Sequence, residues 1–182
     1  MRSESGETSM HISLYHATVP TFLQVLGAMS GLIDKAEAHC REKGLDPSAL
    51  IGARLAADMH PFAWQIKSVA AHSFGAIEAV RSGQAGPDGS ELATDFAGLR
   101  AKVAGAVKGL ETVGYAELDA YIGKPVLFSA GEFKIPFVAE DFLFTFSQPN
   151  FHFHATTAYD ILRHKGLPIG KRDYLGQLRT AG

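Results

Sequence analysis

Three long stretches of this sequence repeat mainly apolar residues at spacings of four and three. This spacing places apolar side chains on one face of an α-helix, and it is typical of helices that pack nearly parallel or antiparallel to their neighbours. The first such stripe comprises Phe22, Leu26, Met29, Ile33, Ala36 and Cys40. No other feature of the chain constrains the fold as strongly, and it predicts a bundle of helices.

Local signals set the expected ends of the first helix. We expect it over residues 19–43, with Thr18 as N-cap, Pro20 in the first turn and Gly44 as the C-terminal stop. A one-turn helix capped by Asp46 should follow.

The next two helices repeat the pattern. The second is expected over residues 59–81 with Asp58 as its cap, and the third over residues 95–113 with Thr94 as its cap. Two further stripes result, the first comprising Phe62, Ile66, Val69, Ser73, Ile77 and Val80 and the second Phe96, Leu99, Val103, Ala106, Leu110 and Val113. His72 lies at the edge of the second-helix stripe.

Short β-type runs at residues 124–129 and 132–137 flank Gly131 and predict a hairpin, which Pro125 and Pro136 place at an edge. The fourth helix is expected from residue 139 to Gly166, with Leu143, Ser147, Asn150, His154, Ala158 and Ile161 facing inward. The long connection between the third and fourth helices suggests a crossover. The predicted fold is therefore all-α: a four-helix bundle with a crossover connection and a small β-hairpin before the last helix.

Composition narrows the class of protein. The chain has 182 residues, which suits one domain over residues 10–182 preceded by a disordered extension over residues 1–9. A net charge of -2 gives no reason to expect nucleic acid as a partner, and no stretch is apolar enough to cross a membrane. The single cysteine, Cys40, fits a cytoplasmic protein and is expected to be a small buried residue. Phosphate-binding glycine loops, dinucleotide fingerprints and His-Glu-x-x-His motifs are missing from the sequence.

The segment from Asn150 to His164 contains the most suggestive polar residues. At about 100° per residue, Asn150 and His154 lie on nearly the same side of the fourth helix, whereas His152 lies almost opposite. The His-x-His spacing would align two ligands on a strand, but this stretch has helical periodicity. His154 is therefore the histidine of this pair that we expect to face the interior.

From about His11 to Gly176 the chain resembles an uncharacterised branch of the DinB-like four-helix-bundle superfamily, a domain of unknown function. The resemblance is carried by Phe-His, Thr-Thr-Ala-Tyr, Leu-Arg-His and Gly-Lys-Arg-Asp-Tyr-Leu-Gly elements that begin at Asn150. It implies the bundle fold and a homodimer, since relatives often pair through their helices. The aromatic run Phe142, Phe144, Phe146, Phe151 and Phe153 should then meet the hairpin, another helix or a second subunit.

The resemblance also implies a metal site. Metal-binding relatives carry one histidine midway along the second helix and two, four residues apart, on the fourth. Leu162-Arg163 sets the register, so that His154 matches the second of the pair and His72 matches the second-helix histidine. Asn150 occupies the position of the third imidazole, and an amide oxygen is a weaker ligand for zinc or nickel.

Two hypotheses follow. In the first, the chain is a metal-free or weakly metal-binding bundle with a cleft, between the second and fourth helices, for a small molecule or a protein partner. In the second, His72 and His154, with Asn150 or water, hold a divalent ion such as zinc or nickel, and the chain is a thiol transferase or hydrolase. In the first case the histidines would hydrogen-bond one another, Asn150 or water, and Asn150 would be an internal hydrogen-bonding residue.

Overall fold

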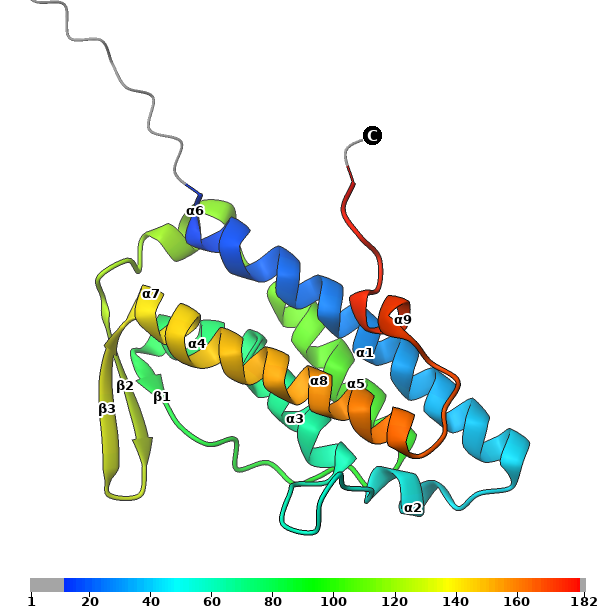
Figure 1. Ribbon diagram of the computed structural model, residues 1–182. Coiled ribbons are helices and arrows are strands. Elements are labelled where there is room, and N and C mark those ends of the chain that lie inside the picture. The colour runs from blue at the N-terminus through cyan, green and yellow to red at the C-terminus, as the bar shows by residue number, and fades with distance from the viewer. Residues whose placement is uncertain (1–11, 181–182) are drawn as a thin grey trace, which may run out of the picture.

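The structure, a computed structural model, describes residues 12–180, so the disordered extension expected over residues 1–9 lies outside the described residues. Its elements, shown in Figure 1, are α1 (Leu14–Lys43), α2 (Pro47–Ile51), α3 (Phe62–Ala71), α4 (Phe74–Ser82), β1 (Gln84–Ala85), α5 (Phe96–Leu110), α6 (Tyr115–Asp119), β2 (Pro125–Ala130), β3 (Phe133–Val138), α7 (Ala139–Asp141), the π-helix η1 (Phe142–Ser147), α8 (Gln148–His164) and α9 (Lys171–Leu175).

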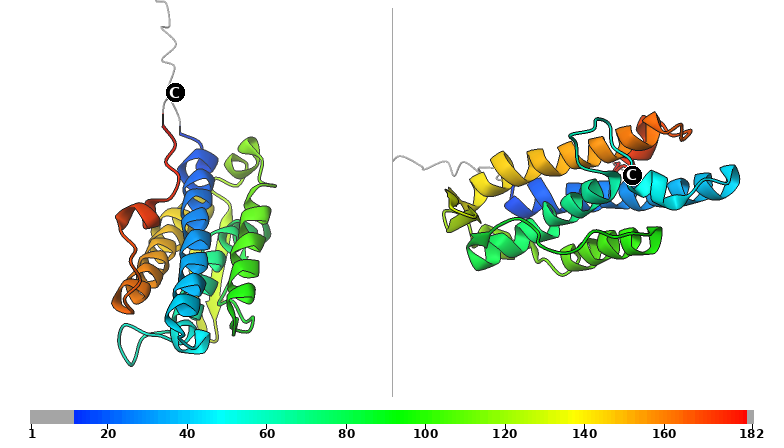
Figure 2. Two further views of the ribbon diagram at one scale, coloured as in Figure 1. Left: turned by 90° about the vertical axis from the view of Figure 1, so that its right-hand side faces the viewer. Right: turned by 90° about the horizontal axis from the view of Figure 1, so that it is seen from below.

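Four helical arms form the bundle: α1, α3 with α4, α5, and the continuous α7–η1–α8 arm. Figure 2 shows α5 and α8 on opposite sides of α1, and α3 packs against both α5 and α8. Every residue of the three stripes predicted for the first three arms is buried. Cys40 is also buried, as expected. These observations confirm the all-α bundle that the periodicity predicts.

The first helix begins earlier than its sequence signals suggest. Ser13 is the N-cap and its Oγ accepts a hydrogen bond from the His16 backbone N–H at 3.2 Å. Thr18, the expected cap, instead lies buried inside α1 and donates its hydroxyl proton to the Leu14 carbonyl at 2.6 Å. The expected stop is confirmed, since Gly44 has a φ of 64°, which favours glycine.

The second arm is broken, where the sequence predicts one continuous helix. It begins after Pro61 rather than at Asp58, and it is interrupted at His72 and Ser73. The Ser73 hydroxyl donates to the Val69 carbonyl at 2.8 Å, which satisfies one of the backbone groups that the break would leave unpaired. His72 therefore lies at the C-cap of α3 rather than midway along a helix.

The fourth arm contains a π-helical turn that the sequence pattern does not reveal. Gln148 donates its backbone N–H to the Leu143 carbonyl, five residues back. Pro149 follows and has no N–H to donate, which weakens the α-helical pattern at this point. The wider turn lies directly before the segment that carries Asn150 and His154.

The predicted hairpin is confirmed, with β2 and β3 antiparallel around a two-residue loop that starts at Gly131. Gly131 has a φ of 61°, as the first loop residue of a type II′ turn requires. The two-residue strand β1 was not predicted; it pairs in parallel with β2 and makes a three-stranded sheet at one end of the bundle (Figure 1).

The crossover lies in a different connection from the one the sequence suggested. Residues 86–95, the crossover segment, run back along the bundle from β1 to the start of α5 (Figure 1). As a result the second arm and α5 run parallel. Lys67 of α3 and Lys102 of α5 both bind Ser90, and seven residues later in each arm Phe74 of α4 lies against Gly109 of α5. The chain connects the third arm to the fourth through α6 and the hairpin, which lie at one end of the bundle.

Candidate functional site: a hollow between two parallel helices

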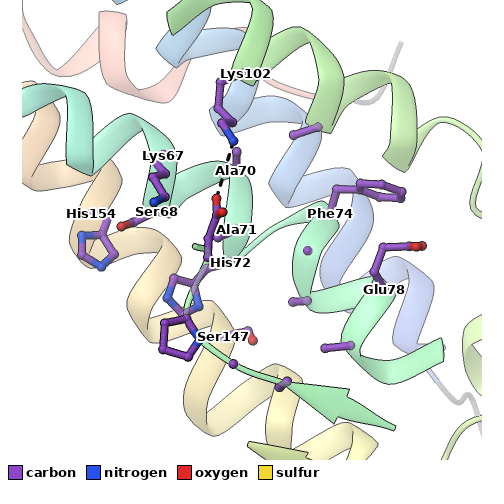
Figure 3. A pocket seen from close by; sticks show the side chains of 18 of the residues that line it. Lys67, Ser68, Ala70, Ala71, His72, Phe74, Glu78, Lys102, Ser147 and His154 are labelled. Carbon is purple, nitrogen blue, oxygen red and sulfur yellow. Dashed lines mark ion pairs between the residues drawn. The ribbon is translucent and has the colours of Figure 1, made fainter. Parts of the chain in front are cut away.

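A cavity of about 1060 Å³ lies between the second arm, formed by α3 and α4, and the wall formed by α5 and the crossover segment. It reaches the fourth arm at Phe142, Phe146, Ser147 and His154. Figure 3 shows His72, His154 and Ser147 grouped in one part of this cavity, with Phe74 and Glu78 in another. The cleft expected between the second and fourth helices thus exists mainly between the second and third arms.

Small side chains create this hollow. On α5, Gly98, Ala101 and Gly105 recur at helical spacing along the lining face, together with Lys102. A Cβ atom built at Gly105 would meet no atom within 4 Å. Larger apolar side chains also line the cavity, namely Trp64, Phe74, Leu92, Phe128, Phe142 and Phe146. The result resembles an ordinary ligand pocket, apolar with a few polar groups.

The two histidines that the sequence singled out lie side by side. The ring centroids of His72 and His154 are 5.8 Å apart and the ring planes differ by 13°. Phe146 packs edge-on against His72, with ring centroids 5.6 Å apart. His72, at the break after α3, and His154, on α8, are therefore neighbours in space although they are far apart in the chain.

Gln65, which the sequence reading missed, fixes the protonation of His154. The Gln65 side-chain amide donates to the His60 carbonyl at 2.9 Å, so its oxygen faces His154 Nδ1 at 2.7 Å. Nδ1 must then carry the proton and donate it to Gln65 Oε1. The lone pair of His154 Nε2 is left for another partner. Metal-binding and hydrogen-bonding histidines are both commonly oriented in this way.

Both imidazoles are neutral at pH 7. Burial lowers the pKa of His72 to about 4. Burial also lowers the pKa of His154 to about 4, and electrostatic interaction with His72 and His60 disfavours its protonated form further. Neutral rings accept hydrogen bonds and, at the same time, are the form that binds metals.

Asn150 does not join the two histidines in the way the resemblance implied. Its side-chain NH₂ donates to the Phe146 carbonyl of its own helix at 2.7 Å, and the residue is not part of the cavity lining. Within residues 12–180, no group of three or more His, Cys, Asp or Glu side chains is placed to hold a metal ion. The role of His72, His154 and Asn150 as metal ligands remains a prediction.

Ser147 is the polar residue of the fourth arm that does reach the cavity. It is fully buried, seven residues before His154, so the two lie on one face of the helix. Among the described residues its hydroxyl has no hydrogen-bond partner, which is costly for a buried polar group. The sequence placed Ser147 on the inward stripe but gave no sign that it lacks a partner.

Charged groups line the side of the cavity that faces the crossover segment. Lys67, only 6% exposed, donates to the Ser90 carbonyl and lies 5.0 Å from the centre of the Trp64 ring. Lys102 donates to the Ser90 hydroxyl at 2.9 Å and pairs with Asp88 at 3.5 Å, the contact dashed in Figure 3. Partial burial acts to raise the pKa of Asp88, but hydrogen bonds from Ser90 and the charges of the two lysines outweigh it. The net effect is a lowered pKa, so Asp88 is ionised.

The aromatic run on the fourth arm divides as expected. Phe142 and Phe146 contact Phe137 of the hairpin, and Phe151 contacts Phe22 of α1 with ring centroids 4.8 Å apart. Phe144 and Phe153 remain 39% and 57% exposed.

No helix of residues 12–180 combines the length and apolar character of a membrane span.

Comparison with known proteins agrees with this architecture. A crystal structure of a DinB family member protein from Shewanella denitrificans superposes with a TM-score of 0.79 at 29% sequence identity, over 93% of this chain and 95% of that one. No curated protein sequence matches the chain. The sequence model of a domain of unknown function, DUF1993, matches residues 14–175, from the start of α1 to the end of α9. The chain therefore belongs to the DUF1993 family and has a DinB-like fold.

Proposed function

We propose that this protein binds a small molecule in the cavity, without needing a metal ion. One observation carries the proposal: a hollow of about 1060 Å³ is lined by the buried Ser147 hydroxyl, which has no hydrogen-bond partner among the described residues, and by His154, whose Nδ1 is held by Gln65 and whose Nε2 lone pair is left for another partner. A bound molecule with an apolar body would cover the small side chains, and a hydroxyl or N–H group on it would satisfy these atoms.

A pocket-filling substitution tests the proposal. The neutral dye N-phenyl-1-naphthylamine fluoresces in apolar surroundings, and Trp64 is the single tryptophan of the chain and lines the cavity. Energy transfer from Trp64 to the dye would report binding at this place. We expect Gly105→Leu to abolish the transfer, since its side chain would extend into the hollow.

Gly27→Leu is the matched control. Gly27 is an exposed position in α1, outside the cavity lining, and a Cβ there also meets nothing within 4 Å. This variant should bind the dye like the wild type. Absence of energy transfer in the wild type, or equal binding by both variants, would contradict a ligand pocket at this site.

A second candidate function is favoured by the Gln65–His154 hydrogen bond. A buried amide that orients a neutral histidine, 5.8 Å from a second neutral histidine, resembles half of a metal site. The donors present fall short of the three protein ligands usual in catalytic zinc sites, since Asn150 points to its own helix.

In that case the protein would be a divalent-metal-dependent thiol transferase or hydrolase. Zinc or nickel would supply a lowered pKa for a coordinated thiol or water. Elemental analysis of protein purified without an affinity tag, and thermal unfolding with added zinc or nickel, test this. Stoichiometric metal that is lost in His72→Ala and His154→Ala would favour the enzyme over the metal-free pocket.

We also propose a homodimer, for which the exposed Phe144 and Phe153 offer apolar surface. Light scattering coupled to size-exclusion chromatography measures the mass directly. A dimer that dissociates in Phe153→Ser, with the helical circular dichroism unchanged, would support pairing through Phe153. A monomer at all concentrations would exclude it.

A further inference from the structure

Lys67 is an unusual residue for a cavity wall. Its side chain is 6% exposed, yet no carboxylate of the described residues lies within ion-pair distance of its ammonium group. Its contacts are one carbonyl oxygen, on Ser90, and the face of Trp64. Buried lysines are usually paired with an acid, so this charge is poorly compensated inside the protein.

The neighbouring charges do not cancel it. Lys102 also binds Ser90, so the two ammonium groups lie near each other, and Asp88 pairs with Lys102 alone. Of the other acids that line the cavity, Glu78 pairs with Arg81 and Glu91 is exposed to solvent at the rim. Lys67, Lys102 and Asp88 together carry one uncompensated positive charge beside an apolar hollow.

We propose that the ligand is an amphipathic organic acid, whose apolar body fills the hollow and whose carboxylate pairs with Lys67. The inference rests on the proposed ligand pocket and adds the chemical class of its occupant. One of the three ammonium hydrogens is committed to Ser90, which leaves donors for a carboxylate. The hydroxyl of Ser147 and the two neutral imidazoles are then available to a polar substituent elsewhere on the same molecule.

Two dyes with one apolar body separate the charge from the pocket. 8-Anilino-1-naphthalenesulfonate carries an anionic group, whereas N-phenyl-1-naphthylamine has the same ring system without it. Titration of each dye, read by energy transfer from Trp64, gives two dissociation constants for every variant. In Lys67→Met the anionic dye should bind at least about tenfold more weakly, and the neutral dye should change by less than about twofold.

Two further variants control for net charge and for packing. Lys35→Met removes the same charge from α1, where Lys35 is exposed and pairs with Asp173, and it should leave both dyes unaffected. Lys67→Arg retains the charge and should keep most of the affinity for the anionic dye. Competition by 1-naphthoate but not by 1-naphthamide would extend the result from a sulfonate to a carboxylate.

The possible outcomes are distinct. Loss of anionic-dye binding alone in Lys67→Met supports the organic acid. If both dyes bind the wild type and Lys67→Met changes neither, or weakens both equally, the pocket stands and the anionic ligand is refuted. If neither dye receives energy from Trp64 in the wild type, the proposed pocket itself fails, and this inference fails with it.

Discussion

The two sides of α3 are packed in opposite ways. Toward α1 and α8, the filled side, large apolar side chains such as Phe22, Phe62 and Phe151 are completely buried. Toward α5 and the crossover segment, the open side, glycine and alanine leave a cavity of about 1060 Å³. Both sides come from helices with the same apolar periodicity, so periodicity places helices in a bundle while side-chain volume decides where the bundle is hollow.

The largest effect is expected on the filled side. Phe151→Ala removes a fully buried ring that packs on Phe22 and should lower the free energy of unfolding by about 3–5 kcal/mol. Phe74→Ala on the open side, where the ring is only partly buried, should cost clearly less. Urea unfolding of both variants measures the difference. Equal losses would mean that the two sides are packed alike.

The next largest effect should come from acid, through the two histidines that line the cavity. The pKa of His72 and that of His154 are each lowered to about 4, from a usual 6.5. Between these values the unfolded chain binds more protons than the folded one, so stability is full above pH 6.5 and is lost as the pH falls toward 4. The loss should be on the order of 2 kcal/mol per histidine, allowing for their partial exposure.

Urea unfolding at several pH values, after removal of metal ions with EDTA, checks this. His154→Asn should flatten the dependence between pH 6.5 and 4. His39→Asn, on α1 away from the cavity, reports the effect of losing a histidine elsewhere. A dependence in His154→Asn as steep as in the wild type would show that His154 does not cause it.

A third prediction concerns a tightly packed position of α5. A Cβ at Gly109 would lie 2.5 Å from the ring of Phe74. Gly109→Ala should therefore destabilise the protein by about 1–3 kcal/mol, although alanine is the better helix former. Pairing it with Phe74→Leu, which removes the ring, should recover part of the loss in thermal unfolding. No recovery would place the strain elsewhere.

The smallest effect should have the opposite sign. Gly105 lies one turn earlier on α5, where a Cβ meets nothing within 4 Å. Gly105→Ala should stabilise the protein by about 0.5–1 kcal/mol, since alanine restricts the unfolded chain and favours the helix. The melting temperature should rise slightly. A fall would mean that this part of the open side is filled.

The sequence predicted the bundle well because each helix needs only a buried face, and all residues of the first three stripes are indeed buried. It placed the crossover in another connection, since the loop after α4 and the segment before α8 are both long enough to return along the bundle. The breaks were harder to predict. The interruption at His72 and Ser73 involves hydrogen bonds from the Ser73 hydroxyl to backbone carbonyls, which a pattern of side chains does not reveal. Pro149 marks a weakened point in the fourth arm, but it does not indicate that the distortion is a π-turn.

The candidate site was predicted in part. His72 and His154 could be paired through the resemblance to metal-binding relatives, and the structure places their ring centroids 5.8 Å apart. Gln65 and Lys67 were missed, since their contacts, with His60 and with Ser90, are made by backbone carbonyls that are invisible in a pattern of side chains. Gln65 lies two helical turns before His72, and that spacing was the one available clue.

The crossover segment also bears on how such a protein can change during evolution. None of residues 86–95 is buried, yet several of them form a wall of the cavity. Substitutions and length changes in an exposed loop are tolerated far better than changes in a core. Relatives that keep the same bundle can therefore diverge in ligand preference through this loop alone, while the helices that determine folding stay under separate selection.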